Sequence, residues 1–132
     1  MQTTTRTALS LTLDARRRRA QSAVDEFTAD IAKNGIGHAV SWGAVPAIIG
    51  EMVLDALDRF DQAVEEHGLD RAVEMAGDVR EGRARRIGYF DPTNTSTSAS
   101  ASLANAAEYQ GHRAVVEILD EIEEAHKVDQ EG

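Results

Sequence analysis

The chain has 132 residues, no cysteine and a formal net charge of −9 at pH 7. Its length allows one core but not two independent ones, and the lack of cysteine excludes disulfides and thiolate metal sites and suits the cytoplasm. Apolar residues make up 42% and charged residues 28% of the chain, so extensive disorder is excluded, and the acidic balance disfavours non-specific binding to nucleic acid.

Only 5% of the residues are aromatic, so Ala, Val, Ile and Leu must fill most of the core. Closely packed, alanine-rich helices fit this composition better than strands. We therefore predict an all-α fold, a small antiparallel bundle of about four helices in a single domain. The helices are expected near residues 10–34, 45–67, 70–84 and 102–126. Polar tails are expected at about 1–9 and 127–132, and a flexible loop at about 88–101.

The first predicted helix contains a run of consecutive arginines, Arg16, Arg17, Arg18 and Arg19. Successive helical residues are about 100° apart, so these side chains point around most of the helix circumference. At least one must therefore lie near the apolar face and extend its guanidinium outward. Gly35 is expected to end this helix.

Residues 35–43 are expected to form a linker, which contains three glycines and the only tryptophan, Trp42. Ser41 should cap the next helix, with Pro46 in its first turn. Because large aromatic side chains supply much apolar area, we expect Trp42 to be buried against the base of that helix. The alternative is that Trp42 is an exposed anchor for a partner.

The central predicted helix, residues 45–67, has the clearest periodicity. Its apolar residues recur every three or four positions, whereas Glu51, Asp55 and Asp58 fall on the opposite side. The apolar face is wide, and the neighbouring alanine-rich helices offer little cover. Part of this surface, or of the last helix, is therefore expected to meet another chain. The apolar set is Val45, Ile49, Met52, Val53, Ala56, Leu57, Phe60, Ala63 and Val64.

Asp70 is expected to cap the shorter third helix, near residues 70–84, which two internal glycines weaken by about 1 kcal/mol each. This helix should fray through residues 80–86. The Ser/Thr-rich run at residues 93–102 has no apolar anchor and is typical of a flexible loop. Ser102 should then cap the last helix.

The sequence contains no pattern that strongly indicates catalysis or metal binding. Glu123 and His126 form one Glu-x-x-His pair of the kind that di-iron bundles use, but such a site needs two pairs. There is no Gly-x-Ser-x-Gly motif, and residues 35–38 lack the third glycine of a dinucleotide-binding loop. We therefore predict no catalytic residue, no metal and no cofactor, and we expect a protein that is not an enzyme.

A second basic cluster lies beside two aromatic residues, a combination that suits phosphate contact and base stacking. The rest of the chain repels phosphate, however, and no helix-turn-helix can be recognised. We interpret this cluster, together with Trp42, as a partner-binding surface whose arginines pair with acidic faces of this chain or of a copy. It consists of Arg80, Arg83, Arg85, Arg86, Tyr89 and Phe90.

These features favour a non-catalytic assembly or interaction protein that binds a protein partner or forms a homo-oligomer. Small helical proteins of this kind occur among bacteriophage and mobile-element products, so a virion structural component is a hypothesis by analogy. The alternative is a small regulator that binds nucleic acid through residues 16–19 and 80–86, or an acidic inhibitor of a nucleic-acid-binding protein.

We predict no membrane-spanning segment, since no run of about 18 apolar residues is present. The arginine run at residues 16–19 follows the apolar residues Leu9, Leu11 and Leu13 instead of preceding them, which is the wrong order for a signal peptide. The expected location is the cytoplasm, or a virion if the protein is a phage component.

Overall fold

The computed structural model of the chain describes residues 7–87 and 99–131. Helices account for nearly all of these residues, and the described part contains no strand. The predicted all-α fold with four helices is therefore confirmed. The helices are α1 (Ala8–Asn34), α2 (Ile36–His67), α3 (Leu69–Ile87) and α4 (Ala99–Glu131).

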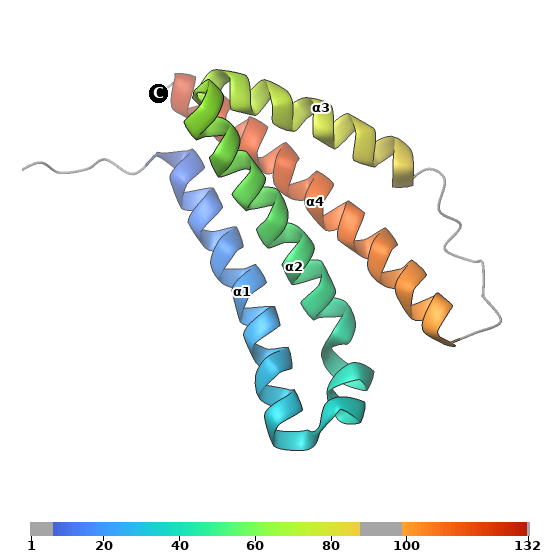
Figure 1. Cartoon of the computed structure of the whole chain (residues 1–132). Helices are drawn as coiled ribbons and strands as arrows, with labels where there is room; N and C mark the ends of the chain where they lie inside the picture. Colours follow the sequence, from blue (N-terminus) through green and yellow to red (C-terminus); the bar gives the residue numbers. More distant parts are fainter. Residues whose placement is uncertain (1–6, 88–98, 132) are drawn as a thin grey trace, which may run out of the picture.

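The helices form two antiparallel hairpins that meet at one end and splay apart at the other (Figure 1). α1 packs on α2, α3 packs on α4, and α2 also contacts both helices of the second hairpin. α1 contacts α4 as well, whereas α1 and α3 do not touch within the described residues. α2 and α4 are therefore the central pair, and the joint between α1 and α2 projects away from α3 and α4 (Figure 1).

Single glycines make the joints between α1 and α2 and between α2 and α3. Gly35 and Gly68 have φ angles of 89° and 86°, a region that side chains disfavour. The N–H of Gly35 donates to the carbonyl of Ile31 at 3.0 Å, and its own carbonyl accepts from Ala39 at 3.2 Å. Gly35 therefore ends one helix and begins the next, so the chain reverses without a linker.

The core lies at the end of the bundle where the two hairpins meet, which we call the closed end. It contains the second half of α2, the first half of α3 and the second half of α4, together with two residues of α1. Its most deeply buried large side chains are Leu57, Val115 and Ile122. Burying an aliphatic side chain of this size stabilises the fold by about 1.5–3 kcal/mol, so these side chains of α2 and α4 contribute substantially to stability.

The C-terminus of α4 also holds the start of α1. The Asp129 carboxylate accepts hydrogen bonds from the N–H groups of Ala8 and Leu9 at 2.7 and 3.0 Å. A carboxylate is favourable at a helix N-terminus, where the N–H groups have no partner within the helix. A polar tail was predicted at residues 127–132, but α4 stays helical to Glu131, so the prediction is wrong for residues 127–131. Helix α1 likewise begins within the predicted tail at 1–9, of which residues 1–6 lie outside the described part.

The predicted linker at residues 35–43 is also wrong, because α2 is continuous from Ile36. Ser41 is not a cap: its hydroxyl donates to the carbonyl of Gly37 within the helix at 3.0 Å. Pro46 lies inside α2 and not in its first turn. The glycine-rich start of α2 stays helical because it packs closely on α1, where a Cβ on Gly43 would touch Phe27 at 3.4 Å.

The boundaries of the last two helices differ from the prediction as well. α3 starts at Leu69, so Asp70 lies within the first turn and is not the cap, and the helix continues to Ile87 without the expected fraying. α4 starts at Ala99, so Ser102 lies inside the helix and is not its cap. Most of the predicted loop at 88–101, namely residues 88–98, lies outside the described residues.

Gly50 should be intolerant of substitution. A Cβ there would lie 2.7 Å from the carbonyl oxygen of Ala20, a backbone atom that cannot rotate away. We expect Gly50→Ala to lower the free energy of unfolding in urea by about 1–3 kcal/mol. The matched control is Gly82→Ala, because a Cβ at position 82 meets nothing within 4 Å. This substitution should raise the free energy of unfolding by about 0.5–1 kcal/mol. Equal effects of the two substitutions would contradict the close approach of α1 and α2.

Candidate interaction surface

The apolar face of α2 continues beyond the part that the other helices cover. Trp42, Val45, Ile49, Val53 and Phe60 share this face by their spacing. Phe60 and Val53 are buried in the core, Ile49 and Val45 are half-buried, and Trp42 is 77% exposed. Burial therefore falls steadily from the closed end of the bundle to the joint with α1.

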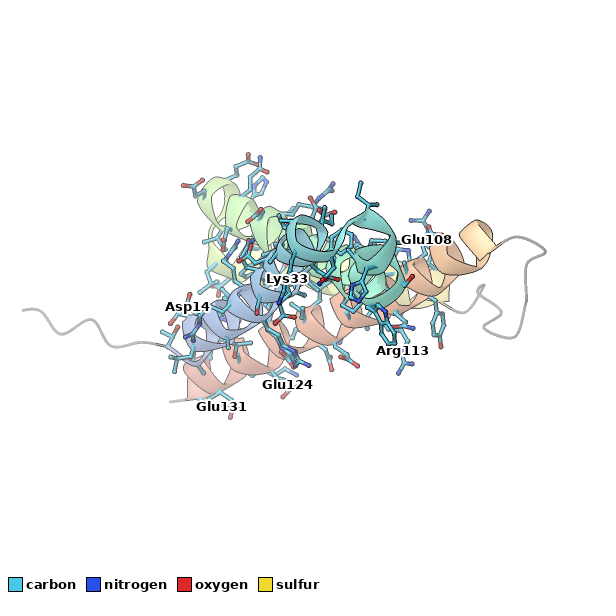
Figure 2. All side chains as sticks on the ribbon, turned by 90° about the horizontal axis from the view of Figure 1, so that it is seen from below. Asp14, Lys33, Glu108, Arg113, Glu124 and Glu131 are labelled. Carbon is cyan, nitrogen blue, oxygen red and sulfur yellow. The ribbon has the colours of Figure 1, made fainter. Side chains whose placement is uncertain are left out.

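The exposed residues of the first turns of α2, residues 36–50, are called the α2 tip; within this range Ala39, Ala44, Ala47 and Gly50 are buried. It contains no Asp, Glu, Lys or Arg, although the whole chain carries a charge of −9. Besides Trp42, the α2 tip contains Ile36, Val40 and Ile48, which are 68%, 41% and 39% exposed. The α2 tip is thus an uncharged, apolar surface on an otherwise acidic protein (Figure 2 looks onto this end of the molecule).

Trp42 is not buried, so the main expectation for this residue is wrong and the exposed alternative describes its position. The indole lies near the His38 ring, with 6.4 Å between the ring centroids. His38 in turn contacts the carboxylate of Asp30 on α1 at 3.1 Å. Trp42 is exposed because α2 extends as a helix past the region where α4 lies against it.

A groove of about 410 Å³ lies beside this face, between three helices. Its floor is made by α2, including Val45, Pro46 and Ile49. One wall is α1, which contributes Arg19, and the other wall is α4, which contributes Glu117. The groove is therefore apolar at its base and carries opposite charges on its two sides.

The first arginine cluster does not gather at one site. Arg16 donates two hydrogen bonds to the Glu121 carboxylate of α4, one of them from Nε at 2.7 Å. Arg17 pairs with two aspartates of α2, Asp58 at 2.6 Å and Asp61 at 2.7 Å. These hydrogen bonds raise the pKa of both guanidinium groups, and the two side chains hold α1 against its neighbours.

The other two arginines of this cluster point to solvent. The Nε of Arg18 contacts the backbone carbonyl of Asp14 at 3.4 Å, and Arg19 is exposed at the groove wall. The sequence predicted that at least one of these arginines would lie near the apolar face, and Arg16 and Arg19 line the groove beside apolar residues of α1 and α2. The sequence could not indicate which arginine would do so, because that depends on the orientation of α1.

The second cluster is also divided. Arg80 bridges Asp120 and Glu123 of α4 at 2.7 and 2.8 Å. Arg85 lies 3.9 Å from Glu81 in its own helix, and Arg86 is exposed. The expected neighbours Tyr89 and Phe90 lie outside the described residues, so the structure does not place the aromatic part of the predicted patch.

The contact between Arg83 and His112 joins α3 to α4 and was not predicted from the sequence. His112 is only 5% exposed, and its Nδ1 lies 2.9 Å from the Arg83 guanidinium. Because arginine can only donate, Nδ1 must be the acceptor. Burial, followed by the charges of Arg83 and Arg86, lowers the pKa of His112 against the opposing effect of Glu108. Burial likewise lowers the pKa of Arg83.

The Glu-x-x-His pair has other partners. The Glu123 carboxylate binds Arg80, and the Nε2 of His126 lies 3.1 Å from Asp70 on α3. Across residues 7–87 and 99–131, no group of three or more His, Asp or Glu side chains is arranged to hold a metal ion.

One helix of the described part is long and apolar enough to cross a membrane, judged by length and composition alone. This is α2, with a mean hydropathy of 1.4 in its most apolar stretch, of which 33% is buried. The core helices of many soluble proteins satisfy the same criterion, and here the second half of α2 forms the bundle core.

No protein-family model matches this chain, and no curated protein or solved structure matches it either. Its function must therefore be inferred from its own surface, where the α2 tip and the adjoining groove stand out from the acidic remainder.

His112 should make the fold sensitive to mild acid. Its pKa in the folded state lies below the unfolded value of about 6.5, so the unfolded chain takes up the proton more readily. Stability is therefore retained above that value and lost as the pH falls below it. When the pH is lowered from about 7 to about 5, we expect the free energy of unfolding of the wild type to fall. The corresponding fall in the His112→Gln variant should be smaller.

The control for this measurement is His67→Gln, which changes an exposed histidine at the end of α2. If His112→Gln and the wild type lost stability equally over this range, buried His112 would not be the source of the acid sensitivity.

Proposed function

We propose that this chain is a non-catalytic interaction protein that uses the α2 tip to bind another protein surface. The observation that carries this proposal is the exposure of Trp42 at one end of an apolar helix face whose other end lies in the core. Exposed apolar surface on folded proteins marks interaction sites, and the exposed side chains of Ile36, Val40, Trp42 and Ile48 all lie in this part of α2. Tryptophan is enriched among residues that dominate binding energy, because a rigid ring buries a large area.

The charge pattern supports the same proposal. Acidic side chains cover the outer faces of α2 and α4, whereas residues 36–50 are uncharged. Acidic faces keep a protein soluble and discourage contact, so the α2 tip is the part of the surface where an apolar partner can approach without removing charges from water. A structural component of a bacteriophage or mobile element is a narrower form of this proposal, based on analogy of size and composition.

The alternative, a regulator that binds nucleic acid, has less support. Arg16, Arg17 and Arg80 already take part in ion pairs with α2 or α4. A phosphate would have to displace carboxylates that lie within hydrogen-bonding distance. The acidic-inhibitor version would use the exposed carboxylates of α2, such as Glu51 and Asp55, which are compatible with a basic partner.

Site-specific photo-crosslinking in the cells that encode the protein tests the proposal. A photoreactive phenylalanine analogue in place of Trp42 should give a discrete crosslinked product. The same analogue in place of Val128, which is 57% exposed at the opposite end of the bundle, should not. Absence of a product at position 42, or equal products at both positions, would contradict the proposed function.

A further inference from the structure

The two walls of the groove beside the α2 tip carry complementary charges. Arg16 of α1 pairs with Glu121 of α4. One helical turn further from the closed end, Arg19 and Glu117 lie on opposite walls of the groove. Both side chains are exposed, and neither forms an ion pair with another described residue, although Glu117 attracts Arg16 at longer range.

We propose that a second copy of this chain packs on the groove and the α2 tip, about a twofold axis that lies in the interface and runs along the groove. A half-turn about such an axis exchanges the two walls, so the α1 wall of each copy faces the α4 wall of the other. Arg19 of each copy then lies opposite Glu117 of its partner, and the two apolar floors face each other. This inference rests on the proposed function and names its partner.

Charge favours a second copy over the other occupants. Two chains that each carry a charge of −9 repel one another over most of their surfaces. The α2 tip is uncharged, and the groove offers one exposed cation opposite one exposed anion. A basic partner would gain more on the acidic outer faces than in this groove, and a lipid surface would leave Arg19 and Glu117 without the reciprocal pairing.

The groove floor provides the apolar part of the contact. Val45 and Ile49 are half-buried, and Pro46 is exposed between them. Pro46 has no N–H, so its replacement removes no hydrogen bond. Its position within α2 therefore allows a charge to be placed on the floor without disturbing the core.

The test is the dissociation constant for self-association of the purified full chain, measured by light scattering after size-exclusion chromatography and by sedimentation equilibrium. Arg19→Glu and Glu117→Arg each replace two attractive pairs with two repulsive ones, so each should weaken the dimer by about tenfold. The double variant reverses both pairs and should restore the affinity. Pro46→Glu should give a monomer with an unchanged circular dichroism spectrum.

Arg18→Glu is the matched control, since it makes the same charge change at an exposed position of α1 outside the groove. It should leave the dissociation constant within about twofold of the wild type. If the wild type were a monomer at every concentration, the inference would be overturned. It would also be overturned if the double variant dimerised no more tightly than the single variants.

The outcomes separate this inference from the proposed function. A monomer whose position 42 crosslinks to a different protein would support the function and overturn the second copy as partner. Sedimentation of a monomer with vesicles of zwitterionic phosphatidylcholine, abolished by Trp42→Gln, would assign the surface to lipid and overturn both.

Discussion

The structure depends on the apolar face of α2 being covered, and α4 covers only part of it. Around Leu57 the face is sealed by Val115 and Ile122, which are almost completely buried. Next to this region α4 approaches α2 so closely that a Cβ on Gly111 would overlap the Met52 side chain. Beyond it the helices diverge (Figure 1), and the same face reaches solvent at Trp42. One helix thus forms the core at one end and an exposed surface at the other, because its partner helix runs in a different direction.

The polar contacts follow from this arrangement. Arg16 and Arg17 fasten α1 to α4 and α2, and Arg80 fastens α3 to α4. The bonds from Asp129 to the start of α1 add a contact at the closed end. Individual exposed ion pairs contribute at most about 1 kcal/mol each, so the apolar core supplies most of the stability. The ion pairs instead favour one alignment of the helices over others.

The fold class could be predicted from the sequence because apolar spacing and low aromatic content are local properties. The pairing of arginines with acidic faces could also be anticipated, but not their partners, which depend on how the antiparallel helices are aligned. The failures share a cause. Gly35 was recognisable as a helix end. Whether another helix follows at once depends on how the start of α2 packs against α1, for example where Gly43 lies against Phe27. The exposure of Trp42 depends on where α4 diverges, and the buried contact of Arg83 with His112 depends on how α3 lies on α4.

Hydrogen exchange along α2, followed as a function of protein concentration, tests the central claim most directly. If the α2 face is core at one end and an interface at the other, amides near Leu57 should be strongly protected at every concentration. Amides near Trp42 should exchange rapidly in dilute solution and become protected as the concentration rises, with no comparable change in α3. Uniform protection along α2 that does not vary with concentration would contradict the account, because it would mean that no second copy covers the exposed end of the helix.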